Sequence, residues 1–359
     1  MNGQPSTGQQ SGLLLGELLS TPPPAFSPFD AQYVAGEYYG LTVRARELSG
    51  ERDRTFLLSQ RDGQRFILKI SNEADTESLR TFQYGVLQHI ERKDPLLPVP
   101  RLIATVDGLD EFRSMGPEGE TLFGSLTTFL PGTAASALAS TRERRLGFGQ
   151  TLATLDAAMS GYSHPSDDRV LPWDLMHAIG LLSVIDAVED GNLRRKIEAF
   201  LHRFDEQVRP VVESLRTQII HNDANNSNLL VDQNDAQSVS GIIDFGDMVR
   251  APLINEVAVC ASYELHGSQD PLGCIVDVVE GFSRVTPLDA SELKYLPDLV
   301  LARLCVRILI TSWRAERFPE NRTYILRNTY PATQAFEQLS TYTETEWTLR
   351  HRQQLHVTR

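Results

Sequence analysis

The segment IIHNDANNSNLLVD, residues 219–232, places a cluster of polar side chains between two apolar flanks. His221, Asp223 and Asn228 lie in this cluster, and Asn228 follows the aspartate at a spacing of five residues. An ordinary surface loop does not need core-type residues on both sides. The flanks therefore predict a loop that buried neighbours hold in place, as a reaction that depends on positioning requires.

A second segment, IIDFGD at residues 242–247, places Asp244 at the end of a short apolar strand. In the first segment, the spacing of Asp223 and Asn228 lets one of them face a substrate hydroxyl while the other faces a metal ion. Asp244 on a neighbouring strand would complete a Mg²⁺ site, because Mg²⁺ takes oxygen ligands, usually one or two carboxylates together with phosphates. This set is typical of phosphoryl transfer in a kinase-like fold. The alternative is structural: Asp223 and Asn228 cap turns, and Asp244 ends a strand.

Lysine is rare in this chain, since only four of its 34 basic residues are lysines. One of them, Lys69, lies in the apolar strand FILKI, residues 66–70, where an ammonium group is costly unless it is paired or reaches solvent. Its place upstream of both acidic segments, in the order found in kinases, favours a contact with nucleotide phosphates. A lysine on an edge strand with its ammonium in water is the alternative.

The turn LSGERDRTF precedes Lys69 by one hairpin and includes Ser49 and Gly50. Backbone and side-chain donors in such a turn can bind phosphate, so both residues are candidates for nucleotide binding. An ordinary hairpin turn explains the same residues.

The hydrophobic pattern divides the chain into a tail and two lobes. Residues 1–28 are rich in Gly, Gln, Ser and Pro and are predicted to be a mobile tail. From about residue 30 the pattern is mostly strand-like, with one helical stretch at 77–91. Residues 29–130 are therefore predicted to form a nucleotide-binding β-rich lobe. Residues 131–359, where helical patterns dominate, are predicted to carry the catalytic loop, the metal site and the substrate pocket. The expected fold class is α+β, a protein-kinase-like two-lobe fold.

Within the second lobe, helices are expected at 142–159 and 192–215, and short strands at 228–232 and 240–245. The common alternatives lack their signatures. The chain contains no GxxxxGK[ST], GxGxxG, HExxH or GxSxG, which argues against a P-loop enzyme, a dinucleotide-binding domain, a zinc protease and an α/β-hydrolase.

Composition limits the partners. The net charge of −13 argues against nucleic acid, which is bound by clustered Lys and Arg. The apolar runs are far shorter than the ~20 residues that span a bilayer, so no membrane association is expected. Three cysteines form no CxxC and leave an odd count, which favours buried thiols in a reducing, cytoplasmic setting.

At HNDANNSN and IIDFGD the sequence resembles the aminoglycoside phosphotransferase and choline kinase superfamily, whose fold is kinase-like. Further segments resemble the hydroxylysine kinase branch of that superfamily: ERDRTF, FILKISN, QHIERKDPLLPVPR, LTTFLPG, LATLDAAMSGYSHP and DFGDMVRAPLINEVAVCASYEL. The resemblance runs from about residue 30 to about residue 330. The catalytic motifs are shared across the superfamily, and the peripheral segments point to the branch.

The resemblance implies a role for each matching residue. Asp223 would be the catalytic base, Asn228 and Asp244 would hold Mg²⁺, and Lys69 would contact the nucleotide phosphates. His221 would be a structural member of the catalytic loop.

The segment after the last strand of the first lobe would form the hinge between the lobes. Phe129 and Leu130, together with Pro131, would lie there against the purine.

The activity implied is transfer of the γ-phosphoryl group of GTP or ATP to a hydroxyl of a small amine-bearing acceptor, most closely 5-hydroxylysine. The resemblance implies GTP, whereas the residues themselves do not decide between the two donors. An aminoglycoside kinase, a kinase of the choline or homoserine type and a nucleotide-binding pseudokinase module remain alternatives. A protein kinase is disfavoured, because only seven residues separate Asp244 from Pro252 and leave no room for a peptide-docking segment.

Two departures from the pattern stand out. Kinase-like folds pair the strand lysine with a helix glutamate, but Thr81, Phe82 and Gln83 occupy the expected positions, and Glu77 follows Lys69 by only eight residues. Residue 222 is Asn where many relatives have Gly, a change expected to be tolerated.

The substrate pocket is expected in the helical lobe. Asp247 and Glu264 are candidates to meet a substrate ammonium. Arginines match carboxylates bidentately, so four of them are candidates for a substrate carboxylate: Arg250, Arg303, Arg307 and Arg314. Ordinary surface pairing is the alternative for each of these side chains.

Overall fold

The computed structural model describes residues 21–48, 50, 52–116, 119–232, 235, 238–327 and 329–356. These residues form two compact units. The described residues up to Pro131, together with His164–Ser166, make up the smaller unit. Gly132–Ser163 and the described residues from Asp167 onward make up the larger one.

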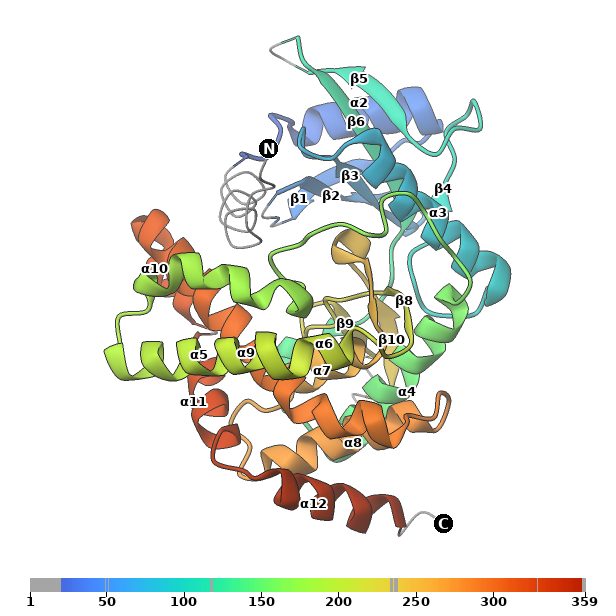
Figure 1. Cartoon of the computed structure of the whole chain (residues 1–359). Helices are drawn as coiled ribbons and strands as arrows, with labels where there is room; N and C mark the ends of the chain where they lie inside the picture. Colours follow the sequence, from blue (N-terminus) through green and yellow to red (C-terminus); the bar gives the residue numbers. More distant parts are fainter. Residues whose placement is uncertain are drawn as a thin grey trace, which may run out of the picture. The chain divides into compact units, whose positions relative to one another are not determined.

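The smaller unit is built on a six-stranded antiparallel sheet with the order β1-β2-β3-β6-β4, in which β5 also pairs with β6 (Figure 1). Its elements are α2 (Pro28–Tyr39), β1 (Arg44–Leu48), β2 (Arg54–Ser59), β3 (Arg65–Ile70), α3 (Glu77–Lys93), β4 (Leu102–Ile103), β5 (Phe112–Met115) and β6 (Thr121–Thr128). The predicted hairpin between β2 and β3 is confirmed, and Gln60 and Gln64 close it. The predicted helix after β3 is α3.

A helix stands where a strand-like pattern was expected. Residues 28–39 form α2, which begins with Pro28 after Ser27. The Ser27 side chain accepts from the backbone N–H of Asp30, and the Asp30 carboxylate accepts from Ser27 in return. This reciprocal capping box, with proline at the first helical position, was the signal missed in the sequence.

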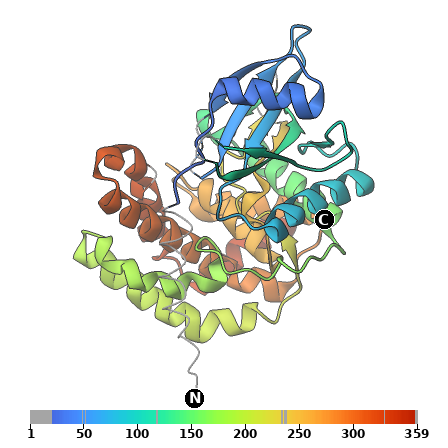
Figure 2. The same ribbon diagram turned by 90° about the horizontal axis from the view of Figure 1, so that it is seen from above.

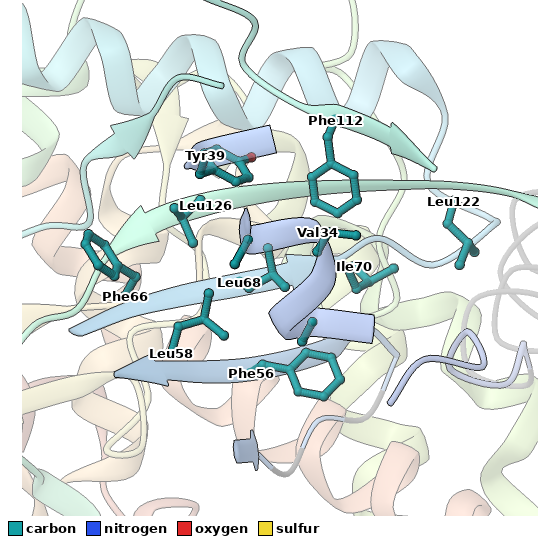
Figure 3. Packing of buried hydrophobic residues seen from close by; sticks show 12 residues of the cluster. Val34, Tyr39, Phe56, Leu58, Phe66, Leu68, Ile70, Phe112, Leu122 and Leu126 are labelled. Atoms are coloured by element: carbon teal, nitrogen blue, oxygen red, sulfur yellow. The ribbon is translucent and has the colours of Figure 1, made fainter. Parts of the chain in front are cut away.

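The helix α2 lies across the sheet and supplies a third of the buried residues of its apolar core (Figure 2). Val34 and Tyr39 from α2 meet apolar side chains from β2, β3, β5 and β6 (Figure 3). Upstream of the helix, Phe26 packs against Phe56, and the carbonyl oxygens of Pro22 and Pro24 accept hydrogen bonds from Asn72 and Arg54. Part of the predicted tail therefore contacts the sheet.

The larger unit is mostly helical. Its α-helices are α4 (Arg142–Met159), α5 (Gly191–Arg203), α6 (Arg209–Val212), α7 (Ile254–Tyr263), α8 (Pro271–Ser283), α9 (Ala290–Arg317), α10 (Arg322–Leu326), α11 (Thr329–Leu339) and α12 (Glu344–His356). The described 3₁₀ segments of this unit are η1 (Ala135–Ala137), η2 (Leu175–Ala187), η4 (Phe245–Asp247) and η5 (Pro319–Asn321). None of the described helices is long and apolar enough to cross a membrane.

Two helical predictions in the larger unit had different outcomes. The helix expected at 142–159 is α4, which packs closely on α8 (Figure 1). A Cβ at Gly149 would come within 2.1 Å of the Val278 carbonyl oxygen, so only glycine permits this approach. The helix expected at 192–215 is instead interrupted by a π-helical turn, η3 (Phe204–Val208), just before Pro210. Proline has no N–H and its ring displaces the preceding carbonyls, which explains the irregular turn.

Two small sheets in the larger unit carry the polar segments of the sequence. One has the order β10-β9-β7, formed by β7 (Thr133–Ala134), β9 (Leu229–Val231) and β10 (Val239–Ile242). The other pairs β8 (Thr217–Ile220) with β11 (Val249–Pro252). The strands β9 and β10 correspond to predicted runs, whereas β8 and β11 were not predicted as a pair.

Candidate active site

The loop at residues 221–228 is held between β8 and β9, as its flanking residues predicted. Ile219 and Ile220 at the end of β8 are buried, as are Leu229 and Val231 in β9. Each strand is also paired with a neighbour, so both ends of the loop are fixed by hydrogen bonds as well as by apolar packing. This is the support that a positioning mechanism needs.

Asp223 is the carboxylate of this loop, and several side chains hold it in place. Its Oδ2 accepts from the side-chain amides of Asn225 and Asn228, both at 2.8 Å, and its Oδ1 lies 2.9 Å from Nη2 of Arg303. Burial is the main cause that raises the pKa of Asp223 to about 8. The nearby carboxylates of Asp247 and Asp244 act in the same direction, and Arg303 opposes them. The carboxylate is therefore held in one orientation and is more basic than an exposed one.

His221 is fully buried below the loop. Its Nε2 lies 3.1 Å from the Ile243 carbonyl oxygen, and its Nδ1 accepts from the backbone N–H of Asp223 at 3.3 Å. Because Nδ1 accepts, the proton is on Nε2 and the ring is neutral. Burial lowers the pKa of His221 to about 4 although Asp244 acts in the other direction, which agrees with this tautomer. His221 thus links the loop to the segment after β10.

Two non-glycine residues of the described chain have positive φ, and both are in this site. Asn222 has φ 63° and Asp244 has φ 67°. Asn and Asp tolerate the left-handed region better than other side chains. Asn222 also donates from its backbone N–H to Glu256 and from its amide to the Asp247 carbonyl oxygen. The asparagine at this position is thus compatible with the local backbone, as expected.

Asn228 and Asp244 are brought together by the pairing of β9 with β10. Leu229 lies opposite Ile242, and the N–H of Ile243 donates to the Asn228 carbonyl oxygen at 2.9 Å. Asn228, just before β9, and Asp244, just after β10, therefore lie at the same end of the strand pair. Because the Asn228 amide also donates to the Asp223 carboxylate, the three residues belong to one region.

The side chains of Asn228 and Asp244 fit a hard cation. The Asn228 side-chain amide donates to the Asp223 carbonyl oxygen and to Asp223 Oδ2, so Oδ1 of Asn228 can serve as a metal ligand. Asp244 is exposed, and its Oδ1 accepts from the Gly246 N–H. Mg²⁺ needs only one or two protein oxygen ligands when phosphates supply others. A protein-only cage of three or more His, Cys, Asp or Glu side chains does not occur in the described part of the chain.

Arg303 was a candidate for substrate binding in the sequence but is paired with Asp223. It is fully buried on α9, where Nη1 donates to the Trp173 carbonyl oxygen at 2.7 Å and Nη2 approaches the Tyr263 hydroxyl at 3.4 Å. A basic residue inside the apolar run LARLCVRILI was the available signal, because a buried arginine requires an acceptor. The identity of that acceptor was not visible in the pattern.

Most of the other acceptor-site candidates have protein partners. Arg250 forms an ion pair with Asp167 at 2.7 Å. Glu264 is buried against Arg144 at 3.3 Å and also hydrogen-bonds Ser140. Both candidates are therefore engaged in structural ion pairs. That of Arg250 fits the pairing expected as the alternative, whereas that of Glu264 lies in the interior and not at the surface.

In the smaller unit, Lys69 lies on an inner strand, because β3 is paired with β2 on one side and β6 on the other. The edge-strand alternative is therefore wrong. Its Nζ forms an ion pair with Asp53 at 2.8 Å and lies 3.4 Å from the Gln83 amide oxygen on α3. Burial raises the pKa of Asp53, but the Lys69 ammonium and the Asn72 N–H outweigh it and hold the pKa below its ordinary value. Asp53 lies immediately before β2. The sequence did not reveal it as the partner of Lys69 because the two residues are far apart along the chain.

The remaining nucleotide candidates also belong to the smaller unit, except that Ser49 lies outside the described residues. A Cβ at Gly50 would come within 2.7 Å of the Asp53 carbonyl oxygen, so the turn is closed tightly on the residue that pairs with Lys69. Phe129 follows β6 and is covered by the Arg65 guanidinium 4.0 Å from its ring centroid, and Leu130 is half-buried next to it.

Solved structures with this architecture are kinases of small molecules. The structure of the microcompartment-associated aminopropanol kinase has a TM-score of 0.68 and 19% identity, and the match covers 88% of this chain and 98% of that chain. An amicoumacin kinase solved with AMP-PNP and Ca²⁺ has a TM-score of 0.63 and 13% identity, and the match covers 89% and 97%. The chain therefore has the kinase-like α+β fold that the sequence predicted.

Sequence similarity identifies the family. The model of the phosphotransferase enzyme family matches residues 44–283. Hydroxylysine kinase of Danio rerio is 31% identical over 306 residues, which is 82% of this chain and 85% of the relative. The chain belongs to the phosphotransferase enzyme family. It is a small-molecule phosphotransferase with an alcohol group as acceptor, as the motifs indicated.

Proposed function

We propose that this protein transfers the γ-phosphoryl group of GTP or ATP to the hydroxyl group of a small amine-bearing acceptor, with 5-hydroxylysine as the first candidate. The observation that carries the proposal is the grouping of Asp223, Asn228 and Asp244 at one end of the β9–β10 pair. The acceptor is suggested by the relative named hydroxylysine kinase. A nucleotide donor is supported by the kinase-like relative that was solved with AMP-PNP.

Asp223 is the proposed base. Phosphoryl transfer has a loose transition state, so the main tasks are to orient the hydroxyl and to stabilise charge, and the proton leaves late. The two amide donors and Arg303 fix the carboxylate for the first task. Burial makes it a stronger base, and the Arg303 ion pair keeps its charged form accessible.

Asn228 and Asp244 are the proposed ligands of Mg²⁺, through the amide Oδ1 and the carboxylate. A bound Mg²⁺ neutralises negative charge on the nucleotide phosphates. In this chain, Asp223 holds the Asn228 amide so that its oxygen is turned away from the base. The left-handed backbone at Asp244 and its contact with the Gly246 N–H hold the second ligand.

Lys69 is the proposed contact to the nucleotide phosphates, and Gly50 with Ser49 the proposed turn over them. Asp53 and Gln83 hold the ammonium on β3 and thus act as the partners that kinase-like folds need. Phe129 and Leu130 remain proposed contacts to the base of the nucleotide. Residues 29–130 would form the nucleotide-binding lobe, and residues 131–359 would form the lobe that binds the acceptor. The three free, buried cysteines support a reducing, cytoplasmic setting.

The test is nucleoside diphosphate release with ATP and with GTP in the presence of Mg²⁺ over a panel of acceptors. The panel contains 5-hydroxylysine, homoserine, choline, ethanolamine and aminoglycosides. Turnover that is specific for 5-hydroxylysine supports the proposal, and a preference for aminoglycosides replaces it with the alternative acceptor class. Nucleotide binding without turnover of any alcohol would indicate a binding module.

Asp223→Asn tests the base. The amide keeps the size of the side chain but cannot take a proton, so kcat should fall by about 10²–10⁴ while nucleotide affinity stays unchanged. Near wild-type kcat would contradict the assignment. Asp168→Asn is a suitable control, because it removes a carboxylate elsewhere in the larger unit.

A further inference from the structure

The helix α9 presents two arginines one turn apart beside the proposed base. Arg303 forms the ion pair with Asp223, and Arg307 follows it at the i+4 position on the same face. The Arg307 guanidinium carbon lies 4.0 Å from the ring centroid of Tyr263, and the Arg303 guanidinium carbon lies 5.8 Å from the same ring. Nη1 of Arg307 donates to the Ser262 carbonyl oxygen at 2.9 Å, which fixes the plane of the guanidinium.

Arg307 is half-buried, and within the described residues it has no acidic partner. Only its Nη1 has a hydrogen-bond acceptor in that part of the chain, so Nε and Nη2 form an unused pair of donors. Burial lowers the pKa of Arg307, and the charge on Arg303 lowers it further. A half-buried guanidinium without an ion pair among the described residues would be stabilised by an anion bound to its unused donors.

We propose that Arg307 binds the carboxylate of the acceptor, so that the acceptor is a hydroxylated amino acid rather than an amino alcohol or an aminoglycoside. The inference rests on the proposed function and specifies its substrate class. The unused Nε and Nη2 donors match a carboxylate bidentately. The other candidate arginines with a defined partner, Arg250 and Arg303, are already paired with Asp167 and Asp223.

The spacing of the two arginines also sets the length of the acceptor. Four residues of an α-helix rise by about 6 Å. Since Arg303 contacts Asp223, a hydroxyl at Asp223 and a carboxylate at Arg307 would be separated by roughly this distance. A chain of several carbon atoms between the two groups, as in 5-hydroxylysine, spans it. An aminoglycoside or a simple amino alcohol has no carboxylate to accept from the unused donors of Arg307.

The experiment compares acceptors that differ only at the carboxylate. We would measure kcat/KM for 5-hydroxylysine, its carboxamide and its decarboxylated form, 1,5-diamino-2-pentanol, with the wild type and with Arg307→Gln. In the wild type, loss of the carboxylate should lower kcat/KM by roughly 10- to 100-fold, the range for a charge-assisted contact. In Arg307→Gln, kcat/KM for 5-hydroxylysine should fall by a similar factor, while the values for the other two acceptors stay within about twofold.

Arg317→Gln is the matched control, because it removes a positive charge from an exposed residue of the same helix about 15 Å further along the axis. It should leave all three values unchanged. Arg307→Lys keeps the charge without the planar donor pair and should restore part of the preference. The comparison of acceptors in the wild type remains decisive if Arg307→Gln does not fold.

Each outcome has a separate meaning. If the wild type phosphorylates the carboxylate-free acceptors as well as 5-hydroxylysine, the carboxylate site is refuted and the proposed function stands. The same holds if Arg307→Gln lowers kcat/KM equally for all acceptors. If no alcohol in the panel is phosphorylated although Mg-nucleotide binds, the proposed function itself fails, and this inference fails with it.

Discussion

Replacement of one buried carboxyl group should change how the stability of this protein depends on pH. Glu256 on α7 and Asp156 on α4 are 0% and 1% exposed. Burial raises the pKa of Asp156, and the charge on Glu256 raises it as well. Oε2 of Glu256 accepts from the backbone N–H of Asn222 at 3.1 Å. Within the described residues, its Oε1 and both carboxyl oxygens of Asp156 have no hydrogen-bond partner. A proton on either group would supply the donor that these oxygens lack.

The magnitude follows from the pKa of Glu256, which burial raises from 4.5 to about 7. A difference of about 2.5 corresponds to on the order of 3 kcal/mol, at about 1.4 kcal/mol for each unit of pKa. The folded state binds this proton more tightly than the unfolded state. The stabilising contribution is therefore complete below pH 4.5 and is lost as the pH rises through about 7.

In the wild type, His221 opposes the contribution of Glu256 to the pH dependence of the free energy of unfolding. Burial lowers its pKa from 6.5 to about 4, so its contribution is complete above pH 6.5 and is lost as the pH falls through about 4. The two slopes oppose each other over most of the same range. The informative quantity is therefore the difference in the free energy of unfolding between Glu256→Gln and the wild type, because His221 contributes to both proteins.

Urea unfolding at pH 5 and at pH 8 measures that difference. The glutamine retains a carbonyl oxygen for the Asn222 N–H but carries no charge, so the variant should gain on the order of 3 kcal/mol relative to the wild type between the two pH values. Glu316→Gln on the exposed face of α9 is the control and should show no such gain. A difference between Glu256→Gln and wild type that is independent of pH, as in the control, would refute the reasoning.

Three further changes test the proposed site. Arg303→Met should reduce the free energy of unfolding by about 3 kcal/mol, because it leaves the half-buried Asp223 carboxyl group and the Trp173 carbonyl oxygen without their buried donor, and Arg303→Lys should recover part of it. Equal stability of all three proteins in urea would speak against the ion pair. Lys69→Ala should lower kcat/KM for the nucleotide by roughly 10²–10³ without changing the KM of the acceptor. An unchanged nucleotide KM in steady-state assays would contradict a contact between Lys69 and the phosphates. Asn228→Ala should raise the Mg²⁺ concentration for half-maximal rate by about 10- to 100-fold, whereas an unaltered Mg²⁺ titration would exclude it as a ligand.

Elements with strong local patterns were predictable from the sequence. The helices α3 and α4 and the β2–β3 hairpin follow from apolar periodicity and turn residues within a single window. The helix α2 was misread because its start is set by a capping box and not by its apolar spacing. The π-helical turn before Pro210 was also missed, because periodicity alone does not show how a proline will be accommodated.

The reactive segments of the site were visible in the sequence, but their partners were not. Asp223 and Asn228 belong to one short loop, so their relation is local. Lys69 pairs with Asp53 and lies near Gln83, and neither contact could be chosen over Glu77 from sequence spacing. These contacts depend on which side chains the sheet and the helix bring together.

The sequence by itself determined the kinase-like class and the order of its polar segments, because those depend on residue type and short-range spacing. Only the tertiary structure decided how charge is distributed around Asp223. It assigned Arg303 to the carboxylate and left Arg307, one turn away, with free donors. Both arginines look alike in the run LARLCVRILI. They differ because electrostatic pairing acts through space, and the packing of α9 against the loop brings only one of them to the carboxylate.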